Sequence, residues 1–311
     1  MTDQHRARVL RSRVSGEASA VVKKRSAPAQ SPAEKTVGGV VSFFADDSTT
    51  TVRDFLKAVR PEARQHRGFD KIHVSDLLNG CARRIALHRR LGLPVPSDTV
   101  WDGRGISFAT GNATHDFVKS RLIAGHNDKF WAKWSCLCRQ QTFLGVGQDV
   151  PKDPCDQCLS PMVIPHEVPF EQEELDLVGT PDALLLLRDY DAFYPVEIKS
   201  VSGKIWQEIA RPRPDDTVQL AIYGKLLLNN GFRVTDIGSV LYVNRDSMFK
   251  NPYKEFPIQL SEVNIDPYYE DLKDLVVAKN GGPLPERKVC PSTDCATAKS
   301  CPVRVQCWGM P

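Results

Sequence analysis

The sequence has no long apolar run, since no segment approaches the roughly 20 consecutive apolar residues that span a bilayer. We therefore expect no membrane-spanning helix. It also has no Gly-x-Gly-x-x-Gly turn and no Gly-x-x-x-x-Gly-Lys-Ser/Thr motif, which argues against a nucleotide-dependent redox enzyme and against a helicase motor in this chain. Residues 1–13 carry four arginines but no apolar segment follows them. The sequence thus predicts neither a signal peptide nor lipidation, and we expect a cytoplasmic protein.

The chain also has little excess charge, with a net charge of +3 over 311 residues. Many nucleic-acid-binding proteins have a larger basic excess or a concentrated basic patch, so the total does not decide the partner. Local clusters lie at 83–84, at 88–90 and at Arg211 and Arg213, and each is also consistent with a solvated surface. The 41% of hydrophobic residues and 25% of charged residues are typical of a soluble globular protein with a sizeable core.

Composition divides the chain into segments. Residues 1–40 are rich in Arg, Lys, Ser, Ala and Pro without a lasting hydrophobic period, which predicts a mobile basic N-terminal arm. Residues 41–311 then form one main domain. Within it, 131–165 changes to Gly, Pro, Asp and Cys, which predicts a small, separately stabilised insertion, and 288–311 is a polar tail that contains four cysteines.

Hydrophobic periodicity predicts strands and helices in a mixed order, which favours an α/β core. The expected helices are 51–59, 75–92, 111–122, 217–228 and 268–278. The expected strands are 174–178, 183–187, 194–198 and 237–243. The second and third of these strands are apolar enough to be buried in a sheet.

Two carboxylates and a lysine form the most informative pattern in this core. Asp182 precedes one apolar strand, and Glu197 and Lys199 end the next strand, fifteen positions further on. An antiparallel pairing would bring the carboxylates together, and alternation would place Glu197 and Lys199 on one face with Ile198 turned into the core. Such a set suits Mg²⁺ or Mn²⁺, which could polarise a phosphodiester and activate water while the lysine orients it. Glu-x-Lys alone occurs about once by chance in a chain of this size, so the context carries the prediction.

The order of the surrounding residues resembles the RecB-like branch of the PD-(D/E)XK nuclease superfamily. That branch has a helical His, then Asp, then Glu-x-Lys, then Gln-x-x-x-Tyr on the next helix, and this chain has His115, Asp182, Glu197, Lys199, Gln219 and Tyr223. The resemblance implies a restriction-endonuclease-like core of a mixed sheet flanked by helices, with catalytic roles for the last five residues. It also implies a Mg²⁺ or Mn²⁺ site made by His115, Asp182, Glu197 and the backbone carbonyl of Ile198. Taken singly, His115 has the alternative of a capping or surface residue, and Tyr223 that of a core residue.

Nine cysteines in a chain expected to be cytoplasmic favour metal or redox chemistry over disulfides. Four of them, Cys290, Cys295, Cys301 and Cys307, lie within the last 22 residues, in a polar stretch that carries Pro291 and Pro302. Thiolates in such a tail favour zinc or an iron–sulfur cluster, and their spacing does not separate the two.

The iron–sulfur subset of the same superfamily includes CRISPR-associated exonucleases, the AddB nuclease domain and many phage exonucleases. It takes one cysteine from an early helix and three from the C-terminus. The resemblance therefore implies a [4Fe–4S] cluster on Cys81, Cys290, Cys301 and Cys307. The chain departs from the usual spacing because Ala298 stands where a ligand is common, so Cys290 or Cys295 must replace it, and we choose Cys290. Zinc at this position and redox sensing are the alternatives.

The insertion has two further pairs, Cys136-x-Cys138 and Cys155-x-x-Cys158, about 16 residues apart. This spacing is close to that of a zinc ribbon, in which two knuckles hold one Zn²⁺ and replace a hydrophobic core. The first pair has one intervening residue where two are usual. Trp131 and Trp134 beside it have two interpretations, stacking on unpaired bases or covering the zinc knuckles.

These patterns together predict a Mg²⁺- or Mn²⁺-dependent DNA exonuclease with bound zinc and an iron–sulfur cluster. Its partner would be DNA, as single strands or ends, in recombination, repair or phage replication, in the cytoplasm of a bacterial or phage-infected cell. A helicase would have to be a separate partner. The alternatives are a nucleic-acid-binding zinc and iron–sulfur protein with a degenerate nuclease core, and an iron–sulfur redox protein. The polarity of digestion, DNA against RNA, endonucleolytic against exonucleolytic action and the oligomeric state stay open.

Overall fold

A computed structural model describes residues 71–78, 80–93, 103–246 and 251–309, all within the unit that spans 50–311. The predicted N-terminal arm, 1–40, and the predicted helix 51–59 lie outside the described residues. Within the described part, no helix is long and apolar enough to cross a membrane.

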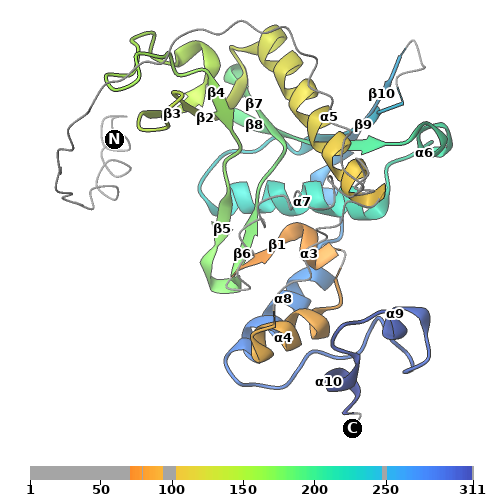
Figure 1. Cartoon of the computed structure of the whole chain (residues 1–311). Helices are drawn as coiled ribbons and strands as arrows, with labels where there is room; N and C mark the ends of the chain where they lie inside the picture. Colours follow the sequence, from red (N-terminus) through yellow and green to blue (C-terminus); the bar gives the residue numbers. More distant parts are fainter. Residues whose placement is uncertain (1–70, 79, 94–102, 247–250, 310–311) are drawn as a thin grey trace, which may run out of the picture. The chain divides into compact units, whose positions relative to one another are not determined.

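A seven-stranded mixed sheet organises the described part of the chain (Figure 1). Its order is β10-β9-β8-β7-β2-β3, with β4 also paired to β2. Among the described strands of this sheet, β8 and β9 pair in parallel and the other pairs are antiparallel. The strands are β2 (Phe130–Ser135), β3 (Thr142–Val146), β4 (Ile164–His166), β7 (Ala183–Leu187), β8 (Ala192–Val201), β9 (Ile237–Asn244) and β10 (Tyr253–Gln259).

A second, three-stranded sheet lies beside the first one. Its order is β1 (Ile72–His73), β6 (Leu177–Gly179) and β5 (Phe170–Gln172), with β1 parallel and β5 antiparallel to β6. The segment 174–178, predicted as a strand, is therefore only partly one. Glu173–Leu175 form a 3₁₀ turn, and Asp176 takes a left-handed conformation with φ of 52° before β6 begins.

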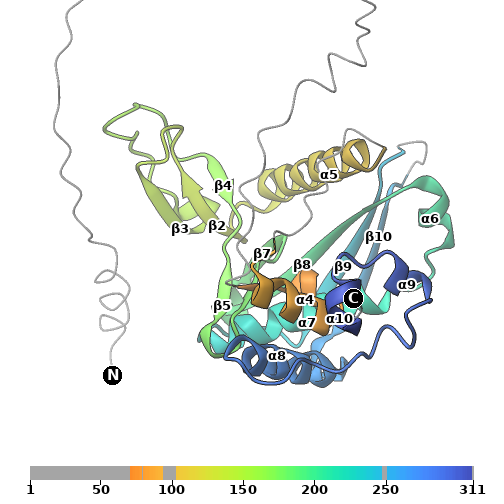
Figure 2. The ribbon, with the colours of Figure 1, turned by 60° about the horizontal axis from the view of Figure 1, so that its bottom comes forward.

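Two long helices cover opposite faces of the main sheet (Figure 2). Helix α5 (Gly103–His126) contacts β8 and β2, and its Val118 packs in one core cluster with Ala183 and Ile198. Helix α7 (Pro214–Asn229) contacts β8 and β9 on the other face, and β5 with α3 (Val74–Leu78) on its far side. Because α7 is enclosed by both sheets, ten of its sixteen residues are buried.

Local chemistry explains where α7 begins. Pro214 occupies the first turn, where its missing N–H costs no hydrogen bond, and Asp215 and Asp216 follow at the positive end of the helix dipole. The predicted helix 217–228 is confirmed, and it starts three residues earlier than its apolar pattern alone indicated. The predicted helix 268–278 is α8 (Asp266–Lys279), and 111–122 lies within α5.

The single helix predicted at 75–92 is two helices, α3 and α4 (Ala82–Leu91). A side chain at Gly80 would place its Cβ 2.2 Å from the carbonyl oxygen of Asp76, so the chain passes between the helices at glycine. Cys81 is consequently not inside a helix but at the N-cap of α4. The remaining α-helices of the described residues are α6 (Gly203–Glu208), α9 (Ala296–Lys299) and α10 (Arg304–Trp308).

The cysteine-rich insertion grows out of the main sheet. Strand β2 pairs with β7 at Phe130 and Trp131, then continues outward to pair with β3 and β4. Trp131 stacks on Phe170, with ring centroids 6.2 Å apart, and Trp134 is 4% exposed with its Nε1 donating to the Gly145 carbonyl. Both tryptophans are thus largely packed inside the protein.

Candidate active site and metal sites

The hairpin of β7 and β8 brings the two predicted carboxylates together. Ala183 is paired with Val196, so Asp182 and Glu197 occupy the next position of the same antiparallel ladder. Asp182 Oδ2 accepts a hydrogen bond of 2.8 Å from the backbone N–H of Ile198. Ile198 itself is fully buried on the α5 side of the sheet. The predicted hairpin and its alternation are therefore confirmed.

Glu197 and Lys199 face α7 and form an ion pair, with 2.7 Å between Oε1 and Nζ. Glu197 is 2% exposed, and its second oxygen, Oε2, is buried without a hydrogen-bond partner. Burial, and next the negative charge of Asp182, raise the pKa of Glu197 well above its usual value. Burial lowers the pKa of Lys199, but the contacts with Glu197 and Asp216 outweigh it, and the net shift is upward. A buried carboxylate oxygen without a donor is a place where a cation would be stabilised.

Helix α7 supplies the next two predicted residues. Gln219 Oε1 accepts from Lys199 Nζ at 2.8 Å, and Gln219 Nε2 donates to the Tyr223 hydroxyl at 2.8 Å. One turn separates these residues, so both side chains leave the same face of α7. Tyr223 is also a core residue, because its ring packs under Gly179, where a Cβ would come within 2.8 Å of it. Tyr223 is therefore a core residue whose hydroxyl also contacts Gln219.

His115 projects from α5 toward the same place. Its Nδ1 lies 3.3 Å from Asp182 Oδ1, and a quarter of its side chain is exposed. The structure thus places all six predicted residues around β8, in two sets of contacts. One set is His115 and Asp182, which is hydrogen-bonded to the β8 backbone, and the other joins Glu197 and Lys199 to Gln219 and Tyr223 of α7.

Sequence reasoning missed two members of this group, Asp216 and Tyr242. Asp216 Oδ1 lies 3.6 Å from Lys199 Nζ, and the Tyr242 hydroxyl donates to Asp216 Oδ2 at 2.5 Å. Both residues are buried. The available signal was the position of Asp216, three residues before Gln219 on the same helix, which places both on one side of α7.

The donor set fits a hard divalent cation, which prefers carboxylate, carbonyl and imidazole ligands over sulfur. Two carboxylates and a histidine meet here, and the unpartnered Glu197 Oε2 is the acceptor left over by the protein's own hydrogen bonds. Both oxygens of Asp182 already have protein partners. In the described residues, these three side chains do not form a group as compact as the cysteines of the insertion.

The insertion contains a compact group that could hold a metal ion. The sulfurs of Cys136, Cys138, Cys155 and Cys158 all lie within 4.8 Å of one another, and Cys136 and Cys155 are fully buried. Each pair is followed by a residue with a left-handed backbone, Arg139 with φ of 59° and Leu159 with φ of 55°.

These tight turns fold each cysteine pair back on itself. The Arg139 N–H donates to the Cys136 carbonyl, and the Leu159 N–H donates to the Cys155 carbonyl. A hydrogen bond from the Ser160 hydroxyl lowers the pKa of Cys158 to about 5, which favours the thiolate that binds metals. The four cysteines could therefore hold a metal ion, whose type the geometry does not identify.

The remaining five cysteines gather where the tail meets α4. Cys307 of α10 is buried with Leu87 of α4 and with Val303, and Cys301 packs against them. Burial, and then a hydrogen bond with Cys295, raise the pKa of Cys290 to about 11, and the charges of Cys81 and Cys301 act in the same direction. In the described part of the chain these sulfurs form no group as compact as that of the insertion.

The basic cluster at 83–90 is largely structural. Arg83 donates to the carbonyl of Pro285 at 2.8 Å, and Arg90 donates to the carbonyls of Ala278 and Gly282. These side chains hold α4 against the end of α8 and the segment that follows it. Arg211 and Arg213, by contrast, are exposed just before α7.

No protein-family model matches this chain, and no curated protein matches its sequence.

Proposed function

We propose that this protein is a metal-dependent DNA exonuclease with a PD-(D/E)XK core. The observation that carries the proposal is the contact of the half-buried Lys199 with the buried Glu197 and Gln219, in which one oxygen of Glu197 lacks a partner. An ion pair that served stability alone would gain little from burial with an unsatisfied oxygen, because desolvation offsets the attraction. A cation at this oxygen removes that cost.

Each side chain has a role in phosphodiester hydrolysis. His115, Asp182, Glu197 and the carbonyl of Ile198 would hold Mg²⁺ or Mn²⁺, which when bound supplies Lewis-acid polarisation and a more acidic water. Lys199 orients the attacking water and offsets the negative charge that develops on the phosphate.

Residues of α7 hold that lysine in place. Gln219 accepts a hydrogen bond from Lys199 and donates one to Tyr223, so the ammonium is oriented before the substrate arrives. Asp216 adds a second negative neighbour to Lys199, which keeps the lysine protonated.

We assign the two cysteine groups to structural metal. Cys136, Cys138, Cys155 and Cys158 suit Zn²⁺, since four thiolates in a tetrahedral arrangement are typical of zinc. Cys81, Cys290, Cys301 and Cys307 would hold a [4Fe–4S] cluster, whose larger core keeps its thiolates further apart than a single ion does. The substrate we expect is DNA, as single strands or ends, in recombination, repair or phage replication.

The test is a cleavage assay on linear and circular single-stranded DNA, linear duplex DNA and RNA, with Mn²⁺ and with EDTA. The proposal predicts metal-dependent release of nucleotides from linear DNA, little cutting of circles, and a loss of at least about 100-fold in Lys199→Ala. Tight DNA binding without cleavage of any substrate would replace the exonuclease with a binding protein.

A further inference from the structure

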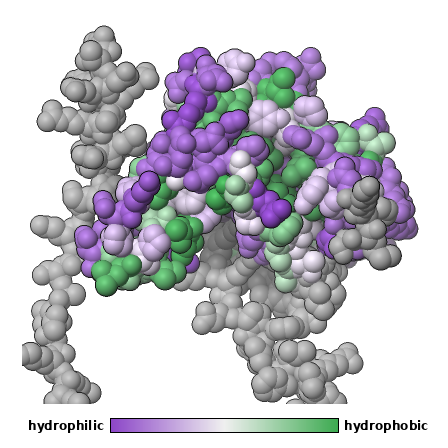
Figure 3. All heavy atoms as spheres, turned by 90° about the horizontal axis from the view of Figure 1, so that it is seen from above, coloured by the Kyte–Doolittle hydropathy of each residue, from purple (hydrophilic) through white to green (hydrophobic). Residues whose placement is uncertain are grey.

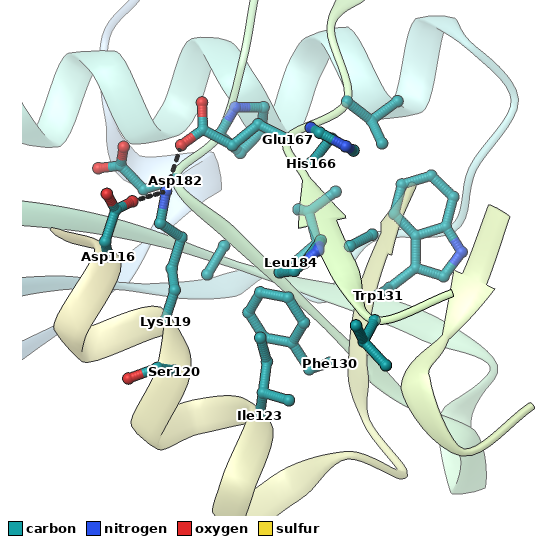
Figure 4. Close-up of a pocket in the computed structure, with 16 residues that line it drawn as sticks. Asp116, Lys119, Ser120, Ile123, Phe130, Trp131, His166, Glu167, Asp182 and Leu184 are labelled. Atoms are coloured by element: carbon teal, nitrogen blue, oxygen red, sulfur yellow. Dashed lines mark hydrogen bonds and ion pairs between the residues drawn. The ribbon is translucent and has the colours of Figure 1, made fainter. Parts of the chain in front are cut away.

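A cavity of about 460 Å³ opens directly beside the candidate active site (Figure 4). Asp182 belongs to both, as one wall of the cavity and as a member of the catalytic group. The other walls come from α5, from β2 with the start of β7, and from the 163–168 segment that leads out of the insertion. The volume falls within the roughly 300–1,000 Å³ of pockets that enclose small organic molecules.

The two ends of the cavity differ in chemistry. At the Asp182 end, Lys119 of α5 lies between two carboxylates, 2.7 Å from Glu167 and 3.4 Å from Asp116. At the opposite end the surface is apolar and aromatic, and Figure 4 shows Ile123, Phe130 and Leu184 grouped there. On the face seen from above, hydrophobic residues are exposed among hydrophilic ones (Figure 3).

We propose that this cavity receives one unpaired nucleobase of single-stranded DNA, next to the phosphate that lies at Asp182. The inference rests on the proposed function and names its substrate class. The apolar end accepts the flat, uncharged face of a base, which commonly binds by stacking on such surfaces. The sugar–phosphate remains at the charged end, where the catalytic side chains are.

Charge decides which part of the nucleotide enters. Asp116, Glu167 and Asp182 outnumber Lys119 at the charged end, so a phosphate is repelled there unless a cation accompanies it. The apolar end carries no carboxylate, and burial of a phosphate in it would be costly. The base therefore enters and the phosphate stays out.

The shape of the cavity determines whether a paired or an unpaired base can enter. Helix α5, the sheet and the 163–168 segment enclose the cavity from three sides, so a base still paired in a duplex could not enter with its partner. Duplex DNA would first have to expose a base by fraying at an end. The cavity thus favours single strands and frayed ends.

The test combines one substitution with one change of substrate. Ile123→Trp fills the apolar end from α5, and Ile123→Leu is its control because it conserves volume. The substrates are two end-labelled single-stranded oligonucleotides, one of them with a single abasic residue at its centre. For the wild-type protein with Mn²⁺, cleavage of the bonds beside the abasic residue should be about tenfold slower than at a normal thymidine.

Ile123→Trp should reduce this tenfold preference to about twofold, whereas Ile123→Leu should keep it. A variant that merely folded less well would slow both substrates equally and leave their ratio unchanged, which would count against the proposal. Equal cleavage of both substrates by the active wild-type protein would overturn the cavity assignment and leave the nuclease intact.

Binding in Ca²⁺ separates the two proposals if no cleavage is seen. A tenfold preference in affinity for the oligonucleotide that retains its base, lost in Ile123→Trp, would support the cavity while the nuclease failed. Absence of both cleavage and preference would overturn both.

Discussion

Lys199 is held in place by three neighbouring side chains. Glu197, Gln219 and Asp216 surround its ammonium at 2.7, 2.8 and 3.6 Å. Such contacts restrict the rotation of a long side chain. The entropic cost of ordering Lys199 therefore falls on the folding of the protein and not on the reaction. An ammonium that is already oriented can stabilise a negative charge that develops beside it, and we assign this role to Lys199.

We predict that Gln219→Ala lowers the rate of cleavage about tenfold, because Lys199 loses one charge-assisted hydrogen bond worth roughly 1.5–3 kcal/mol. The decrease should appear in kcat while KM for DNA changes little. Asn229→Ala is the control, since it also removes a side-chain amide from α7 but at an exposed position at the end of the helix, and it should retain the wild-type rate. Equal rates for both variants would show that Gln219 has no positioning role.

Single residues were predictable where local spacing decides their position. Glu197 and Lys199 are two positions apart on one strand, and Gln219 and Tyr223 are one helical turn apart. The sequence was therefore sufficient to predict that the members of each pair share a face. The hydrogen bond between Tyr242 and Asp216 was not predictable, because it joins residues of β9 and α7 that are 26 positions apart.

Among the elements, β2 connects the insertion to the active-site sheet. Its first residues pair with β7, and its last residue, Ser135, precedes Cys136 directly. A metal ion among the four cysteines would therefore fix the outer end of a strand whose inner end lines the cavity beside Asp182.

We predict about one zinc per chain at this site. Cys158→Ser should abolish zinc retention and lower the melting temperature by roughly 6–12 °C, which corresponds to a loss of about 3 kcal/mol in a domain of this size. Cys295→Ser is the matched control and should keep its zinc. Elemental analysis and thermal unfolding check both, and full zinc in Cys158→Ser would exclude this ligand.

The element predictions departed from the structure for physical reasons. The break between α3 and α4 arises from the close approach of Gly80 to Asp76, which a hydrophobic pattern does not report. Trp131 and Trp134 lie in a segment predicted to be a polar insertion, but pairing of β2 with β7 and with β3 makes most of each side chain buried. Both depend on contacts that the local sequence pattern does not contain.

At the scale of the whole described unit, the tail returns to the start of the fold. Helix α10 contacts α4, and Arg287 lies 4.6 Å from the Trp308 ring while donating to the Cys307 carbonyl. These contacts bring Cys301 and Cys307 to the helix that Cys81 precedes. A cluster there would join residues more than 200 positions apart.

We predict that anaerobically purified protein contains about four iron atoms per chain and shows the visible absorbance of an iron–sulfur cluster. Cys81→Ala and Cys307→Ala should each lose both signals, while Cys295→Ser should retain them. Zinc in place of iron, or full iron in Cys81→Ala, would contradict this ligand set.

The α/β class and the pairing of the central hairpin followed from sequence because buried strands and amphipathic helices leave strong local patterns. The proposed nuclease activity depends instead on side chains that come together from α5, β8 and α7. Asp182 is central to this proposal. It contacts His115 of α5 and the backbone of β8, and it also lines the cavity.

The most direct measurement is the single-turnover rate of single-stranded DNA cleavage in Mn²⁺ for Asp182→Asn. Its control is Asp189→Asn, which makes the same chemical change at an exposed position in the turn at the far end of the hairpin. We predict a decrease of at least about 100-fold for Asp182→Asn and a wild-type rate for Asp189→Asn. Cleavage by Asp182→Asn within about twofold of the wild-type rate would contradict the proposed active site.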